Sequence, residues 1–216
     1  MNDLNHIIDH IRAELESRSD ARDSAIRRSR QLIRHCANSI RAMHRGEFEH
    51  AGKLLEAARQ DAALMVQDIQ VHPGVYLAGY TQDSLKELVE ACAVYAMLRH
   101  EPIPAPDAIG VEVDYPAYLN GLAEAASEMR RAILDTIRKG DLERGELLLD
   151  KMQDVYAAMT TIDFPDAVTG GLRRTTDALR AVLERTRGDL TVTSQQEKLR
   201  QALARIEDRM RDATQE

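Results

Sequence analysis

Two pairs of glutamates stand out in this sequence because they interrupt apolar or small-residue segments at helical spacings. Glu87 and Glu90 are three residues apart, which places both on one face of a helix. The surrounding segment, residues 85–98, is apolar nearly all round and is therefore expected to be buried. A buried carboxylate without a partner is unfavourable, so these side chains need partners. Lys86 lies on a different face and cannot easily serve both.

The second pair, Glu124 and Glu128, is four residues apart and also shares one helix face. Gly121 lies inside the same expected helix, where glycine costs about 1 kcal/mol relative to alanine. Close approach of another helix or of a ligand is a physical reason for such a glycine. The remaining neighbours of the pair are also small: Ala123, Ala125, Ala126 and Ser127.

Two helices that each present two carboxylates can together form a site for a cation. All the ligands would be hard oxygen atoms, and no histidine stands at the matching spacing. Such a set favours one or two Mg²⁺ or Mn²⁺ ions, which leave positions for water and for substrate phosphates. Glutamates at these spacings are also common on solvated helices, so the pattern by itself leaves both interpretations open.

The composition indicates that these glutamates stand on an all-α framework. The chain has 216 residues, of which 44% are hydrophobic, with only 11 glycines and 6 prolines to break long elements. Strong helix formers dominate, and no apolar–polar alternation indicates a sheet. No boundary divides the chain, so we expect one domain over residues 1–216.

Seven helical segments are expected. Asp114 is the expected N-cap of the helix that carries Glu124, with Pro116 in its first turn. The segment 45–56 resembles 139–150, which predicts two helical hairpins with the same turn chemistry. The expected ranges are 3–45 (with a candidate bend near 17–20), 47–70, 82–100, 114–139, 141–161, 166–187 and 194–213.

The charge distribution is uneven. The net charge of −7 argues against a general nucleic-acid binder, yet residues 24–46 contain no acidic side chain. Arginines in this stretch form a stripe that is interpreted either as a solvated or assembly face or as a track for phosphates. The stripe consists of Arg27, Arg30, Arg34, Arg41 and Arg45.

The remaining features indicate a soluble, cytoplasmic protein with no membrane partner. Cys36 and Cys92 lie in apolar helical stretches and are expected to be reduced core thiols. The N-terminus lacks the apolar region of a signal peptide, and no apolar run approaches the roughly 20 residues of a membrane span.

Several collinear stretches resemble the translin/Trax family. Residues 29–48 look like its first long helix and turn, and Glu87-Leu-Val-Glu-Ala91 looks like the Glu-Tyr-Val-Glu-Ala of the Trax branch. Residues 114–131 resemble its Asp-Tyr-Leu-x-Gly-x-Ala-Asp-x-x-x-Glu-x-x-Arg motif. Lys139-Gly-Asp141 falls where the family has a Gly-Asp turn. The similarity spans most of the chain.

This resemblance implies a seven-helix fold that assembles into a hollow homo-oligomer, typically an octamer. It also implies an endoribonuclease that cuts single-stranded RNA with Mg²⁺ inside that shell, through attack of a metal-activated water on the phosphodiester. The chain looks closest to the catalytic Trax-like branch of archaeal or bacterial type. The family's metal carboxylates fall on Glu87, Glu90, Glu124 and Glu128, although Trax has Asp where this chain has Glu124. Arg131 matches the family's arginine and would steady a phosphate or pair with a glutamate.

Two alternative functions remain open from the sequence. All-α nucleoside triphosphate pyrophosphatases also use Glu-x-x-Glu with a second acidic pair on a neighbouring helix. A non-catalytic translin-like subunit that binds RNA or single-stranded DNA would need the arginines but not the carboxylates. Cleavage of RNA, release of pyrophosphate and binding without products distinguish the three functions.

Overall fold

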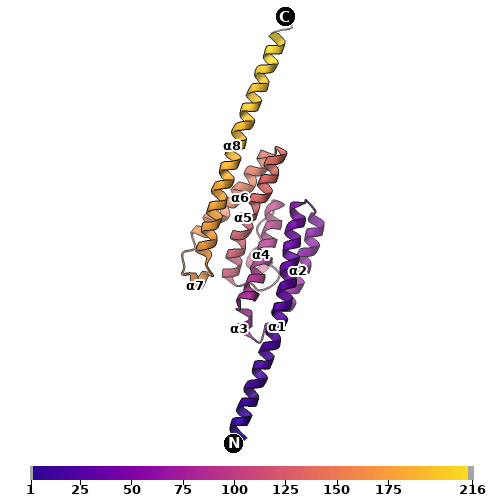
Figure 1. The fold of residues 1–216 in the computed structure, drawn as a ribbon, viewed down its shortest axis with the longest axis vertical. Coiled ribbons are helices and arrows are strands. Elements are labelled where there is room, and N and C mark those ends of the chain that lie inside the picture. Colours follow the sequence, from indigo (N-terminus) through magenta and orange to yellow (C-terminus); the bar gives the residue numbers. More distant parts are fainter. Residues whose placement is uncertain (1, 214–216) are drawn as a thin grey trace.

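The computed structural model describes residues 2–213, and every regular element in that range is helical (Figure 1). The expected all-α fold is therefore confirmed. Within the same residues, no helix is long and apolar enough to cross a membrane. The elements in chain order are α1 (Asn2–His44), α2 (Phe48–Ile69), α3 (Pro73–Tyr76), α4 (Gly79–Leu98), the 3₁₀ turn η1 (Pro106–Ala108), α5 (Tyr115–Lys139), α6 (Leu142–Thr160), α7 (Asp166–Thr169) and α8 (Leu172–Ala213).

The two long terminal helices differ from their expected forms. Helix α1 continues through residues 17–20 without a break, and the helices expected at 166–187 and 194–213 are replaced by the single turn α7 and the long helix α8. The hydroxyls of Thr191 and Thr193 hydrogen-bond to carbonyl oxygens four residues earlier, at 2.8 and 2.9 Å. These bonds fit threonine into a continuous helix, so the Gly188–Thr193 stretch does not end α8.

Two helix ends have the same turn, as the internal sequence similarity predicts. Gly46 and Gly140 both have positive φ, at 79° and 77°. In each turn the residue after the glycine donates its amide to a carbonyl near the helix end, at 2.9 Å for Glu47 and 3.0 Å for Asp141. This is the Schellman arrangement, which closes a helix with glycine in the left-handed conformation. The α1–α2 and α5–α6 hairpins are therefore built alike.

Helices α4 and α5 lie side by side in the middle of the bundle. Helices α1 and α2 pack on the α4 side, and α6 and α8 pack on the α5 side (Figure 1). The burial expected for α4 is observed, since Leu88 and Val89 are completely inaccessible. Cys36 and Cys92 are also buried, and burial raises the pKa of both thiols.

The N-terminal part of α1 and the C-terminal part of α8 project beyond the bundle at opposite ends (Figure 1). Both projections expose large apolar side chains along one face. The N-terminal stripe consists of Leu4, Ile8, Ile11 and Leu15, and the C-terminal stripe consists of Leu199, Leu203, Ile206 and Met210. Both stripes advance by four, three and four residues, which is the heptad spacing of a coiled-coil seam.

Candidate metal centre

Three of the predicted carboxylates converge between α4 and α5. Glu87 and Glu90 come from α4, and Glu124 comes from α5. Each contributes one oxygen atom, and these atoms all lie within 4.8 Å of one another. All three side chains are partly buried. The structure thus brings together both predicted helices and three of the four predicted glutamates in one cluster.

Gly121 explains why the two helices approach so closely at this point. A Cβ atom at Gly121 would lie 2.7 Å from the carbonyl oxygen of Lys86 and 2.9 Å from Cβ of Val89. No side chain fits in that space, so the close approach expected for this glycine is observed. Gly121 is one helical turn before Glu124, and Lys86 directly precedes Glu87. The helix contact therefore sets the separation of the carboxylates.

Glu90 is a strongly perturbed carboxyl group in this cluster. Burial, followed by the negative charges of Glu87, Glu124 and Glu128, raises the pKa of Glu90 to about 8. A carboxylic acid with this pKa is mostly protonated at neutral pH when no metal ion is bound beside it. The cluster is therefore short of positive charge.

Lys86 supplies part of that positive charge. Its Nζ lies 3.5 Å from Oε1 of Glu87 and donates a short hydrogen bond to Oε2 of Glu124. Although burial lowers the pKa of Lys86, the bond to Glu124 and the neighbouring carboxylates raise it overall. Lys86 thus pairs with one glutamate of α4, Glu87, and with Glu124 on α5. The sequence did not predict this bridge between the two helices.

Glu128 lies beside the cluster but has a different partner. Its Oε1 is 2.8 Å from Nε2 of His44, whose side chain is only 3% exposed, at the end of α1. Arg131 approaches the same oxygen at 3.8 Å and is otherwise largely exposed. Glu128 is thus anchored to α1, while its charge still acts on Glu90. The sequence holds no signal for the His44 contact, because the two residues are 84 positions apart.

Known proteins of the same shape identify the family. No family model matches the sequence. The structure of AfC3PO superposes with a TM-score of 0.79 at 31% sequence identity, and that of AfC3PO in complex with duplex RNA with a TM-score of 0.75 at 30% identity; each alignment covers 87% of this chain and 96% of AfC3PO. The chain belongs to the translin/Trax family, to which C3PO proteins belong. The resemblance to this family that the sequence indicated is thereby confirmed.

Two further proteins are similar to this translin/Trax chain over most of its length. Apo-NeC3PO has the same fold, with a TM-score of 0.77 at 22% identity, over 86% of this chain and 96% of NeC3PO. The uncharacterized protein MJ0175 of Methanocaldococcus jannaschii is 29% identical over 212 residues, which cover 96% of this chain and 90% of MJ0175. The likeness to relatives therefore spans most of the chain.

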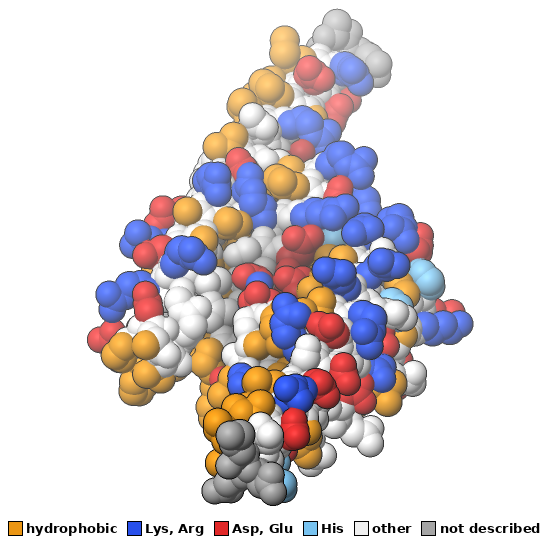
Figure 2. Space-filling view, turned by 60° about the horizontal axis from the view of Figure 1, so that its bottom comes forward, with side chains coloured by type: hydrophobic (Ala, Val, Ile, Leu, Met, Phe, Trp, Pro, Cys, Tyr) orange, Lys and Arg blue, Asp and Glu red, His pale blue; other side chains and the backbone are white. Residues whose placement is uncertain are grey.

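The predicted arginine stripe of this translin/Trax chain lies at solvent-exposed positions of α1. Arg27, Arg30 and Arg34 are exposed, and no side chain among residues 4–212 forms an ion pair or hydrogen bond with them. Arg41 instead donates a hydrogen bond to Asn38, and Arg45 forms a bidentate ion pair with Glu47. Figure 2 shows acidic side chains gathered near the middle of one face, with Lys and Arg side chains along their border.

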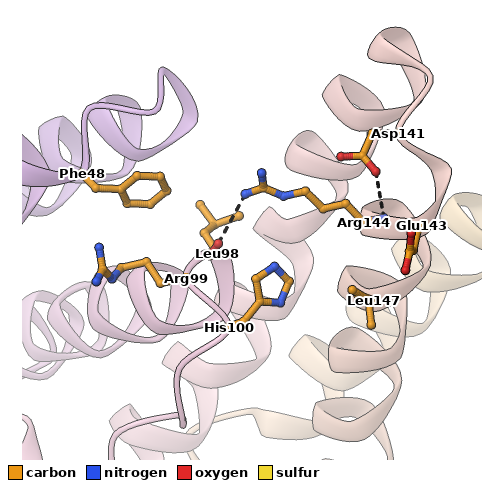
Figure 3. Close-up of a pocket in the computed structure, with 8 residues that line it drawn as sticks. All are labelled: Phe48, Leu98, Arg99, His100, Asp141, Glu143, Arg144 and Leu147. Carbon is orange, nitrogen blue, oxygen red and sulfur yellow. Dashed lines mark hydrogen bonds between the residues drawn. The ribbon is translucent and has the colours of Figure 1, made fainter.

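A separate hollow of about 520 Å³ lies where the end of α4 meets the start of α6 (Figure 3). Its cationic groups already have partners in the chain. Arg144 donates to the carbonyl oxygen of Leu98, and Arg99 pairs with Glu101. Asp141 accepts from the backbone amide of Arg144 as the N-cap of α6. These contacts join two helix ends, so the carboxylate cluster remains the better candidate for chemistry.

Proposed function

We propose that this chain is a metal-dependent endoribonuclease that cleaves single-stranded RNA, with Mg²⁺ or Mn²⁺ as its cofactor. The observation that carries the proposal is the convergence of Glu87, Glu90 and Glu124 within 4.8 Å. A set of oxygen ligands at this density suits a hard divalent cation. Glu128 is the proposed fourth carboxylate, since its charge already acts on Glu90.

The charges of the cluster support the same choice of cofactor. Burial, followed by the negative charges of Glu87, Glu124 and Glu128, raises the pKa of Glu90 to about 8. A divalent cation would relieve this repulsion and allow Glu90 to ionise. When bound, the ion activates a water molecule and neutralises negative charge on the phosphodiester. Lys86 holds Glu87 and Glu124 in place, and His44 holds Glu128.

The arginine stripe is the proposed track for the RNA backbone. Arg27, Arg30 and Arg34 are available to phosphates because they have no acidic partner within the described side chains. Arg41, Arg45 and Arg131 belong to the same proposed surface, although each already contacts a neighbouring side chain. Phosphate contacts fix the position of a strand without reading its sequence, so we expect weak sequence preference. The relative AfC3PO has been seen in complex with duplex RNA.

We further propose that the chain works as a hollow homo-oligomer, an octamer by analogy with its family. The apolar stripes of the α1 and α8 projections support assembly, because exposed heptad seams are stabilised when a second helix covers them. Leu4 and Leu199 are 63% and 62% exposed in the single chain. A second copy of this chain offers helices with the same seam spacing. Cleavage would then take place inside a closed shell.

The decisive experiment is incubation of the purified protein with labelled single-stranded RNA, duplex RNA and single-stranded DNA. Each substrate is tested with Mg²⁺, with Mn²⁺ and with chelator, and the mass of the same sample is measured by light scattering. We expect internal cleavage of single-stranded RNA that requires the metal. Binding that persists in chelator with no products under either metal would instead indicate a non-catalytic subunit. Release of pyrophosphate from nucleoside triphosphates without RNA cleavage would indicate a pyrophosphatase.

A further inference from the structure

A cavity of about 210 Å³ adjoins the carboxylate cluster and extends from it to the start of α8. Lys86 and Glu124 of the cluster line it, and so do Asn120 of α5 and Arg174 and Thr175 of α8. None of its lining side chains among the described residues is aromatic. The cavity therefore offers polar and charged groups beside the cluster but no platform on which a base could stack.

Arg174 is the unpaired cation of this cavity. Its side chain is exposed, and its guanidinium has no hydrogen bond or ion pair with any side chain among residues 4–212. The adjacent Arg173 differs, because it pairs with Asp163 at 3.3 Å. Arg174 also stands in the first turn of α8, where the helix dipole favours a bound anion. An unpaired guanidinium at this position suits a phosphate group.

A partly buried hydrogen-bond network holds the start of α8, next to Arg174, against the helix that carries Glu124. Asn120 donates to the carbonyl oxygens of Pro116 and Thr169, at 2.8 and 3.0 Å, and accepts from the hydroxyl of Thr175 at 2.6 Å. Asn120 thereby connects α5, α7 and α8, and it lies one helical turn before Glu124. Thr175 directly follows Arg174. The backbone from which Arg174 projects is thus held by the same helix that carries Glu124.

We propose that this cavity binds the ribose–phosphate unit that flanks the scissile phosphate, with Arg174 holding its phosphate. The inference rests on the proposed function, since it deepens the same site. The cavity is large enough for a ribose with one phosphate. Its polar and charged side chains suit contacts with the sugar–phosphate backbone rather than with the bases. The metal cluster would then act on one phosphate of the strand while Arg174 holds the next. Arg174 is thus a second anchor, separate from the arginine stripe on α1.

The test measures binding of a short single-stranded RNA to the full-length protein in chelator, where no cleavage occurs. The variants are Arg174→Ala and Arg174→Lys, with Arg173→Ala as the matched control. Affinity is measured over a range of salt concentrations, because each phosphate contact on a single strand contributes about 0.7 to the slope of log affinity against log salt. We expect Arg174→Ala to lower this slope by about 0.7 and to weaken binding roughly fivefold or more at low salt.

The other variants separate the charge from the geometry of the guanidinium. Arg174→Lys should keep the slope of the unsubstituted protein but bind more weakly, because an ammonium cannot make two parallel bonds to phosphate. Arg173→Ala should match the unsubstituted protein. Equal slopes and affinities for Arg174→Ala and Arg173→Ala would overturn this proposal while leaving the nuclease intact. Failure of the unsubstituted protein to bind RNA at all would overturn the proposed function as well.

Discussion

Gly121 on α5 packs directly against the backbone of Lys86 on α4, since a Cβ atom at Gly121 would lie 2.7 Å from the Lys86 carbonyl oxygen. Replacing Gly121 with alanine should therefore push the two helices apart. We expect Gly121→Ala to lower the free energy of unfolding by roughly 1–3 kcal/mol, as measured in urea. It should also reduce metal-dependent RNA cleavage, because Glu124 moves away from Glu87 and Glu90.

Gly188 provides the matched control for this prediction. It is also a helical glycine, but a Cβ atom there would have no neighbour within 4 Å. Gly188→Ala should raise the free energy of unfolding by about 0.5–1 kcal/mol, because alanine loses less conformational entropy in a helix. If both alanine variants changed stability in the same direction, the close contact at Gly121 would not govern the packing of α4 on α5.

Removing one negative charge from the cluster should abolish cleavage without unfolding the protein. Glu87→Gln and Glu124→Gln each replace a proposed metal ligand by a neutral amide of the same size. We expect the rate of RNA cleavage to fall roughly a hundredfold or more in each, because the ion loses a charged ligand. Binding of RNA in chelator should remain. Glu146→Gln, at an exposed glutamate of α6, should retain full activity, and full activity in either cluster variant would reject the site.

The periodicity of the sequence is sufficient to predict the faces of the central helices, because helical geometry relates Glu87 to Glu90 and Glu124 to Glu128 without any tertiary information. Gly121 likewise predicted a close helix contact. The contacts of His44 and Lys86 were not predictable, because one joins residues far apart in sequence and the other depends on how a flexible side chain folds back. The unbroken α8 was missed because glycine and β-branched residues at 188–193 resemble a helix end.

The raised pKa of Glu90 makes stability depend on pH. In the unfolded chain this carboxyl releases its proton near its ordinary pKa of 4.5, whereas in the folded chain it does so near pH 8. Between these values the folded state holds a proton that the unfolded state has lost, so the free energy of unfolding falls as pH rises and levels off above pH 8. Glu90→Gln has no carboxyl group at this position, so it should not show this fall in the free energy of unfolding.

We therefore expect Glu90→Gln to be more stable than the unsubstituted protein at pH 8.5 in chelator, by on the order of a few kcal/mol, with little difference at pH 4.5. Urea denaturation at both pH values measures the difference. Added Mg²⁺ should narrow the gap at pH 8.5 by stabilising only the protein that retains Glu90. A difference in stability that is the same at both pH values would show that the carboxyl is not perturbed.

The apolar stripe on the α8 projection should govern assembly. Leu203 and Ile206 are 51% and 52% exposed and occupy adjacent seam positions. A charge at Leu203 would be buried in any helix–helix contact along that seam, so Leu203→Glu should lower the oligomer mass in light scattering. Ala204 is the matched control, because it lies outside the seam on the same exposed helix. Ala204→Glu introduces the same charge and should leave the mass unchanged. An unchanged mass in Leu203→Glu, at concentrations where the unsubstituted protein is oligomeric, would exclude this stripe from the interface.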